Sequence, residues 1–196
     1  RPAGEGGPEL GVTGPVVTDL AAGRLLVATP LLGDPHFART VVLLLQHDDE
    51  DGALGLVLDR ETRTPVGEVL LGWGRLAVGS GHVHEGGPVQ PEAAICLGRL
   101  VPGGSTGSFS ELEGSPGLGT VDLDGDPDAL PLEAVRVYAG YAGWSAGQLE
   151  SEVDDGAWWV LDSLPGDALT PRPDRLREQV LRRQGPPLAF AAVLPD

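Results

Sequence analysis

Three side chains between residues 34 and 47 are of types that bind or carry charge: Asp34, Arg39 and His47. Arg39 could pair through both terminal nitrogens with Asp34 across a short turn, and the pair would then only hold a corner of the chain. Alternatively, Arg39 and the backbone N–H groups of the turn could hold a phosphate-bearing anion, with His47 as a donor that changes charge near neutral pH. We expect the structural role and keep the anion site as the functional hypothesis.

The second candidate is Ser145, inside the segment GWSAG (residues 143–147). This segment fits G-x-S-x-G, the nucleophile elbow of α/β hydrolases, in which the acid and the histidine follow the serine in sequence. All four histidines here precede Ser145, although His47 or His84 could still reach it in space, because geometry defines a triad. Ser145 and Gln148 also fit a capping box, which predicts a helix through Glu152. We expect the helix cap and keep a hydrolase as the alternative.

Metal-binding patterns are weak in this sequence. His82 and His84 would share one face of a strand and could bind zinc with a third ligand, but no partner has a recognisable spacing. The alternating carboxylates from Asp122 to Asp128 do not fit a calcium-binding loop, which favours an exposed acidic turn. Cys96, alone among apolar residues, is expected to be an unreactive buried thiol. The sequence therefore predicts neither a metal nor a cofactor.

Glycines and aromatic residues complete the candidate set. The turn Gly86-Gly87-Pro88 indicates a close approach of backbone, which packing against a neighbouring strand explains better than a ligand. Tyr141 and Trp144 place aromatic surface near the Ser145 turn, and such side chains more often fill a core than hold a ligand. No catalytic residue is assigned. The candidate ligand-binding residues are Asp34, Arg39, His47, Gly86, Gly87, Tyr141, Trp144 and Ser145.

These residues must be positioned by a mixture of short strands and helices. Residues 25–28 predict a buried strand, Asp34-Pro35 predicts a short turn through Arg39, and residues 40–46 and 53–58 predict a hairpin joined at Asp51-Gly52. Further strands are expected over residues 93–97, 133–139 and 158–159, a long loop over 102–119, and a short strand in the tail after residue 185. Helices are expected over residues 66–73, with Thr64 as the cap, and over 173–184.

Composition limits the classes of function. The chain of 196 residues has a net charge of −16, which opposes direct binding to nucleic acid. All its basic residues apart from histidine are arginines, so a P-loop lysine and a Schiff-base lysine are excluded. One cysteine allows no internal disulfide, and no stretch resembles a signal peptide or a membrane span. We expect a cytoplasmic protein with a disordered tail over residues 1–14 and one domain over residues 15–196.

Three ordered blocks resemble the YqgE/AlgH family of bacterial proteins, which are often labelled transcriptional regulators. The blocks are LLVATPLLGDPHFARTVVLLLQHD with GALGLVLDR, then Gly86–Val89, then GYAGWSAGQLE over residues 140–150. The resemblance implies an α+β fold in which a mixed, barrel-like sheet carries several short helices, and it implies no established reaction. The family pattern has Asn where this chain has Asp59 and commonly His where it has Gly98.

Two classes of function follow. The first is a non-catalytic regulatory module that binds a small anionic ligand or a protein partner, with no direct contact to nucleic acid or membrane. The second is a hydrolase-type enzyme that uses Ser145 or the group Asp34, Arg39 and His47. We expect the first, because an enzyme would need a histidine or carboxylate within hydrogen-bond reach of Ser145.

Overall fold

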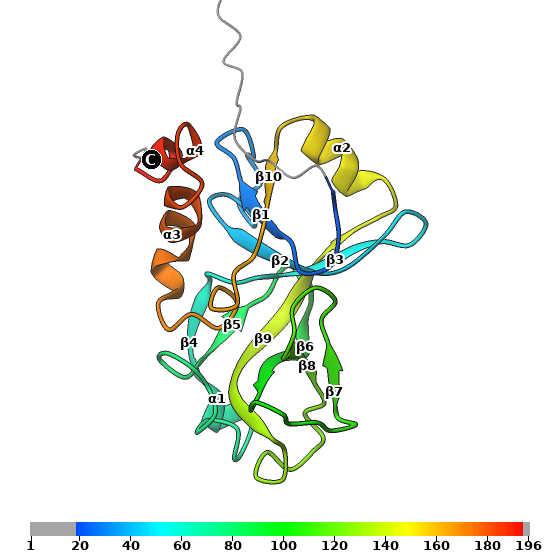
Figure 1. Ribbon diagram of the computed structural model, residues 1–196, viewed down its shortest axis with the longest axis vertical. Helices are drawn as coiled ribbons and strands as arrows, with labels where there is room; N and C mark the ends of the chain where they lie inside the picture. Colours follow the sequence, from blue (N-terminus) through cyan, green and yellow to red (C-terminus); the bar gives the residue numbers. More distant parts are fainter. Residues whose placement is uncertain (1–18, 194–196) are drawn as a thin grey trace, which may run out of the picture.

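The computed structural model describes residues 19–193, and the expected tail over residues 1–14 lies outside this part. Ten strands form one curled sheet in the order β10-β1-β2-β3-β9-β6-β8-β7, with β5 paired to both β9 and β4 (Figure 1). The strands are β1 (Leu25–Ala28), β2 (Val41–Asp48), β3 (Gly52–Val57), β4 (Glu61–Pro65), β5 (His82–Glu85), β6 (Val89–Leu100), β7 (Phe109–Glu111), β8 (Leu118–Val121), β9 (Leu132–Trp144) and β10 (Trp158–Leu161).

One long strand, β9, belongs to both halves of the sheet (Figure 1). Its C-terminal residues pair with β3, from Ala142 to Trp144, and its preceding residues pair antiparallel with β6 and, at Tyr138 and Ala139, parallel with β5. Gly140 has a φ of 72°, and a Cβ there would lie 2.5 Å from the Gly87 carbonyl oxygen. Only glycine fits this backbone without strain, so β9 bends at Gly140 and the sheet curls into a half-barrel.

Short helices and a 3-10 turn cover parts of the sheet. They are α1 (Val66–Val69), α2 (Gln148–Asp154), η1 (Pro173–Arg175), α3 (Leu176–Arg182) and α4 (Leu188–Ala191). The expected C-terminal helix is confirmed in η1 and α3, and Leu176 and Val180 are fully buried on its inner face. Within residues 19–193 no helix is long and apolar enough to cross a membrane.

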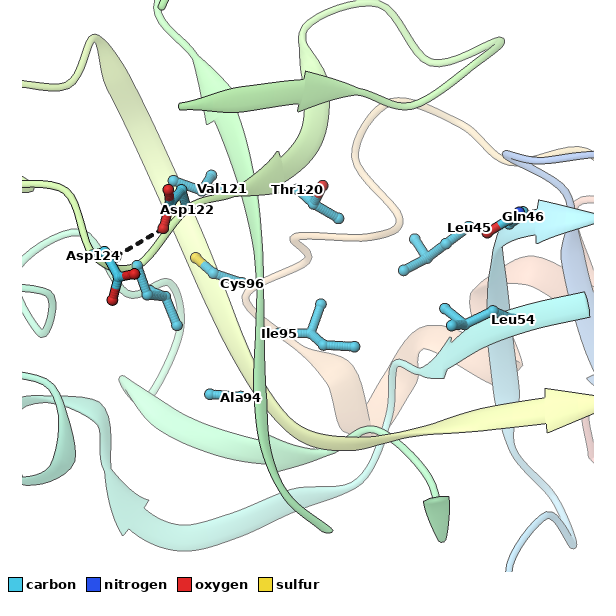
Figure 2. Close-up of a pocket in the computed structure, with 11 residues that line it drawn as sticks. Leu45, Gln46, Leu54, Ala94, Ile95, Cys96, Thr120, Val121, Asp122 and Asp124 are labelled. Atoms are coloured by element: carbon cyan, nitrogen blue, oxygen red, sulfur yellow. Dashed lines mark hydrogen bonds between the residues drawn. The ribbon is translucent and has the colours of Figure 1, made fainter. Parts of the chain in front are cut away.

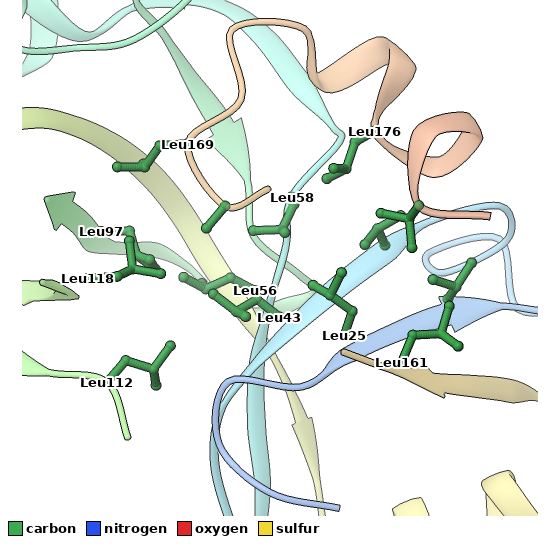
Figure 3. Packing of buried hydrophobic residues seen from close by; sticks show 14 of the residues in the cluster. Leu25, Leu43, Leu56, Leu58, Leu97, Leu112, Leu118, Leu161, Leu169 and Leu176 are labelled. Atoms are coloured by element: carbon green, nitrogen blue, oxygen red, sulfur yellow. The ribbon is translucent and has the colours of Figure 1, made fainter. Parts of the chain in front are cut away.

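The core follows from the predicted central hairpin. Residues Val41 to Leu44 of β2 are fully buried on both faces, as their uninterrupted apolar run indicates. Leu43 and Leu56 face one apolar cluster with Leu25, Leu97 and residues of α3 (Figure 3). Val42 and Leu44 face a second cluster on the other side of the sheet, which contains Trp144 and Trp158. The mixed, barrel-like α+β domain expected from the sequence is confirmed.

Three local predictions were wrong. The expected loop over residues 102–119 contains β7 and the start of β8, which pair across the turn at Ser115–Gly117. In the described part of the C-terminal tail, residues 186–193, the chain forms α4 in place of the expected strand, and its apolar residues pack beside α3. Helix α1 begins at Val66 as expected, but it has only four residues, and its N-cap is Pro65 and not the expected Thr64.

Candidate functional site

An open groove separates the β2–β3 hairpin from β6 and β8 (Figure 2). Its cavity has a volume of about 600 Å³. Ile95 of β6 points from one wall toward Leu45 and Leu54 on the other, so the floor between them is apolar. Its lining residues are Leu45, Gln46, Leu54, Ala94, Ile95, Cys96 and the run from Thr120 to Asp124.

The groove continues along β2 toward α2. A neighbouring cavity of about 370 Å³ shares Leu45, Gln46 and Thr120 with the first and adds His47 together with residues 110–113. A third, of about 470 Å³, shares His47 and Leu20 with the second and reaches Glu150 of α2. The three cavities together extend along β2 from Asp124 to Glu150, and we call this series of open cavities the channel.

Two strand edges border this channel. β1 pairs with β2 only from Val41 to Leu43, so within the described chain Gln46 to Asp48 have a strand partner on the β3 side alone. Leu45 lies at the irregularity between Leu44 and Gln46, where the β2–β3 register shifts. β7 is the last strand of the sheet and pairs only with β8 among residues 19–193. Backbone N–H and C=O groups on such edges can accept a further strand.

The walls of the channel are acidic. Among the described residues that line the three cavities there is no arginine, but there are eight exposed or half-buried carboxylates. They are Asp19, Asp48, Asp49, Glu111, Glu113, Asp122 and Asp124, with Glu150 at the α2 end. This distribution attracts cations and disfavours an anion in the channel.

Cys96 lines the groove without offering a nucleophile. Its side chain is buried, and burial raises the pKa of the thiol to about 12. A thiol with so high a pKa carries almost no thiolate at neutral pH, as the sequence predicted.

The corner at residues 34–39 is a hydrogen-bonded turn. The Phe37 and Ala38 N–H groups donate to the Asp34 carbonyl, and the His36 N–H donates to Asp34 Oδ1 at 2.8 Å, so Asp34 acts as the expected cap. Arg39 ends the turn with a φ of 64°, and its charge lowers the pKa of Arg177 on α3, after the larger effect of burial. An anion site on Arg39 stays a prediction.

The structure does not bring His47 to this corner. His47 lies six residues along β2 from Val41, about 20 Å at the usual rise of a strand. Its Nε2 lies 2.6 Å from Glu150 Oε1 of α2 instead. The proposed group Asp34, Arg39 and His47 is therefore split between the two ends of one strand.

Trp144 and Ser145 belong to a network that fastens α2 to the sheet. Glu152 Oε2 accepts the indole N–H groups of Trp144 and Trp158 at 2.9 and 2.8 Å, and its Oε1 accepts from Gln148 Nε2. Gln148 Oε1 in turn accepts from the backbone N–H and the hydroxyl of Ser145. Half of the predicted capping box is thus present, while Gly147 is the N-cap of α2.

The aromatic residues of this network form a packed cluster. Phe37 of the first corner stacks on Trp144 with ring centroids 5.9 Å apart and meets Trp158 edge-on. Trp144 is 5% exposed, so it fills the core, as expected from its type. The first and third sequence blocks of the family resemblance therefore meet in one aromatic cluster.

The described residues give the Ser145 hydroxyl one hydrogen-bond partner, the amide of Gln148. Neither His47, which pairs with Glu150, nor His84, which is buried on β5, contacts it in this part of the chain. Ser145 is also absent from the non-glycine residues with positive φ among residues 19–193, which are Arg39 and Gln90. The strained elbow of a hydrolase is not seen here, and the hydrolase stays an untested alternative.

Gly86 and Gly87 pack against β9. A Cβ on Gly86 would lie 2.2 Å from the Gly140 carbonyl oxygen, and a Cβ on Gly87 would lie 2.2 Å from the carbonyl carbon of Tyr141. Close packing of backbone, the role favoured from the sequence, thus accounts for both glycines. Tyr141 is half-buried against the larger apolar cluster.

The two strand histidines differ in environment. His84 is 1% exposed, and burial followed by the charge of Arg136 lowers its pKa to about 4, so it is neutral at pH 7. His82 is half-exposed and lies 3.2 Å from Glu61 Oε1 through Nδ1. Within the described residues, the groups of three potential metal ligands include neither of them.

Asp59 carries an unusual carboxyl group. The residue is partly exposed, but burial of the carboxyl group by the surrounding chain raises its pKa to about 7. The Val41 N–H, which donates to Oδ1 at 3.1 Å, and the charges of Arg60 and Arg177 lower the pKa, but by less. Near neutral pH it is therefore shared between its charged and neutral forms.

Sequence reasoning missed the groove because it missed one of its walls. Residues 109–112 and 118–121 each begin and end with an apolar residue, but the strands that form there are short, and the surrounding Gly and Ser residues obscure the hairpin signal. With that hairpin assigned, Thr120 and Glu111 would have faced the central hairpin as candidates.

Fold and site together define a single α+β domain with a half-barrel sheet and an acidic channel along its open edges. Residues 25–189 match the family model described as AlgH-like, and this chain belongs to that family. It is 49% identical over 179 residues to the UPF0301 protein SCO2948 of Streptomyces coelicolor, covering 89% of this chain and 92% of that one. A UPF0301 protein of Thermobifida fusca is 44% identical over 88% of this chain and 91% of its own.

Two solved structures are similar as well. The crystal structure of protein DIP2367 from Corynebacterium diphtheriae has a TM-score of 0.83 and 28% identity, covering 90% of this chain and 93% of that one. The solution structure of the AlgH protein from Pseudomonas aeruginosa has a TM-score of 0.66 and 29% identity, covering 89% and 94%. The family assignment made from the sequence blocks is confirmed.

Proposed function

We propose that this protein is a non-catalytic binding module that receives an extended, basic segment of a protein partner in its channel. The supporting observation is the channel itself, which is walled by carboxylates and bordered by edges of β2 and β7 that have no further strand partner within residues 19–193. An extended segment could add backbone hydrogen bonds to either edge, while Leu45, Leu54 and Ile95 accept its apolar side chains. Its arginines or lysines would face the carboxylates.

Charge decides which partner suits the channel. The acidic walls disfavour a small anionic ligand there, so the anion predicted from the sequence would belong to the separate corner at Arg39. They also disfavour a nucleic acid, in line with the net charge of −16. A regulatory role, as the family label suggests, would then act through a protein partner in the cytoplasm.

The test is fluorescence anisotropy with a labelled octapeptide of alternating Arg and Val at low salt. The double variant Asp122→Asn/Asp124→Asn is expected to bind it about three- to tenfold more weakly, because two charge contacts of under about 1 kcal/mol each are lost. Asparagine at position 122 still has an Oδ1 atom that can accept the hydrogen bond from the backbone N–H of residue 124. Thr120→Trp, which fills the groove without changing its charge, is expected to abolish binding.

The charge-matched control is Asp154→Asn/Asp155→Asn at the exposed C-terminal end of α2, which should leave binding unchanged. Equal weakening by both double variants, or equal binding of a peptide of alternating Glu and Val, would show that the channel does not recognise a basic segment. Turnover of an acyl ester that disappears in Ser145→Ala would instead favour the hydrolase alternative.

A further inference from the structure

The α2 end of the channel gathers three different metal-ligating side chains. One ligand atom each from His47, Asp49 and Glu150 lies within 4.8 Å of the other two, and no other group of three is found in residues 19–193. The His47 Nε2 to Glu150 Oε1 distance is 2.6 Å. An imidazole nitrogen and two carboxylate oxygens at this separation can close around one ion, with bonds of about 2.0–2.2 Å.

Three separate segments supply these ligands. His47 comes from β2, Asp49 from the turn between β2 and β3, and Glu150 from the first turn of α2. The His47 side chain is 11% exposed and that of Glu150 is 39% exposed, so the imidazole is fixed while the carboxylate can adjust. His47 and Glu150 are 103 residues apart in sequence, so it is the fold that brings their ligand atoms together.

The space beside the three ligands is open. The cavity of about 470 Å³ at this end is lined by Asp19, Leu20, His47, Asp48, Asp49 and Glu150. A protein ligand set of three leaves further coordination positions, and here they would face this cavity, where water or a group of a partner could complete the shell.

We propose that His47, Asp49 and Glu150 bind one divalent transition-metal ion, such as Zn²⁺ or Mn²⁺. The imidazole favours these ions over Mg²⁺ and Ca²⁺, which prefer oxygen ligands only. The ion would replace the direct His47–Glu150 hydrogen bond and join the β2–β3 turn to α2. This departs from the absence of a metal expected from the sequence, and it does not depend on the peptide-binding role.

The competing explanation is a plain ion pair between His47 and Glu150 beside a solvated Asp49. The pKa of the Glu150 carboxyl is lowered, first by its own backbone N–H and then by the His47 imidazole. This lowered pKa is compatible with both explanations and does not distinguish them. The two explanations differ in the role of Asp49, which is a ligand in the metal site and has no role in the ion pair.

The test is isothermal titration calorimetry of the untagged full chain with Zn²⁺, and separately Mn²⁺, at pH 7 with excess Mg²⁺ present. We expect one ion per chain and an affinity at least tenfold lower in Asp49→Asn and in Glu150→Gln. The matched control is Glu50→Gln, which removes the same charge from the same turn but lies outside the ligand group, and its affinity should stay within about twofold. Unchanged thermal midpoints of the metal-free variants would show that the fold survives.

Imidazole NMR signals give a second readout that does not depend on the variants. Zn²⁺ should shift the signals of His47 and leave those of His36, His82 and His84 in place. Absence of saturable binding up to millimolar Zn²⁺, an affinity that Asp49→Asn leaves unchanged, or a shift of another histidine would each overturn the proposal.

Discussion

At the scale of single residues, Asp59 is the clearest departure from an ordinary environment. Its pKa of about 7 in the folded chain exceeds the value near 3.9 of an unfolded aspartate, so the folded state holds its proton more tightly. The stability that this contributes is complete below about pH 4 and is lost as the pH rises toward 7. Above pH 7 the folded protein bears a carboxylate in a site that disfavours the charge.

Asp59→Asn should therefore stabilise the protein at high pH. Asparagine keeps an acceptor for the Val41 N–H without the charge. We expect the free energy of unfolding at pH 8 to rise by at least about 1 kcal/mol, with a gain that shrinks as the pH falls toward 4. Urea unfolding from pH 4 to pH 8 measures this, with Asp124→Asn as the exposed control. A gain independent of pH would contradict the assigned cause.

Single residues also show where sequence reasoning stops. Cys96 and Trp144 were predicted as buried, because thiol and indole types in apolar runs are seldom free. The link between His47 and Glu150 could not be predicted, since it depends on where the fold places α2 relative to the end of β2 and not on any local pattern. Pairing of groups 103 residues apart is a property of the folded chain.

At the scale of elements, Glu152 holds α2 to the sheet through both indoles and Gln148. Glu152→Ala would leave the two indole N–H groups without this acceptor in an aromatic cluster. We expect a loss of about 2–4 kcal/mol in the free energy of unfolding, because hydrogen bonds to a charged group are lost together. Glu133→Ala, at an exposed position of β9, is the control.

Tryptophan fluorescence during urea unfolding would report this change directly, since Trp144 and Trp158 are the side chains that Glu152 contacts. A loss below about 0.5 kcal/mol, equal to that of the control, would show that α2 is held by its apolar residue Leu149 and not by the network.

Elements were predicted best where their signals were uniform. Local signals were enough to predict three elements: the apolar run of β2, the turn at Asp51-Gly52, and the periodic apolar residues of the arginine-rich helix α3. The β7–β8 hairpin was missed because its strands are short and rich in Gly and Ser. That omission removed one wall of the channel, so the site could not be assembled from the sequence even though the central hairpin was correct.

At the scale of the whole molecule, β9 pairs with strands of both halves of the sheet, so we expect the two halves to unfold as one cooperative unit. Gly140→Ala would place a Cβ 2.5 Å from the Gly87 carbonyl oxygen at a φ of 72°. We expect it to cost at least about 2 kcal/mol more than Gly147→Ala, which has a φ of 75° but nothing within 4 Å of the added atom. Calorimetry measures the loss of stability in both variants. Gly147→Ala gives the effect of backbone strain alone, and Gly140→Ala gives the effect of strain together with a steric clash.

Hydrogen exchange then tests the cooperativity. In Gly140→Ala the protection of β2 in one half and of β6 in the other should fall by the same amount, because both elements depend on β9 directly or through β3. Loss of protection in one half alone would mean that the halves unfold separately.

The open edges of β2 and β7 have a consequence for how copies of this protein behave together. An unpaired strand edge is a template on which identical chains can stack, and natural proteins suppress this with charge. The carboxylates at Asp48, Asp49, Glu111 and Glu113 stand beside these edges, and like charges on two approaching copies repel. The acidity that would select a basic partner would thus also oppose edge-to-edge stacking of identical copies.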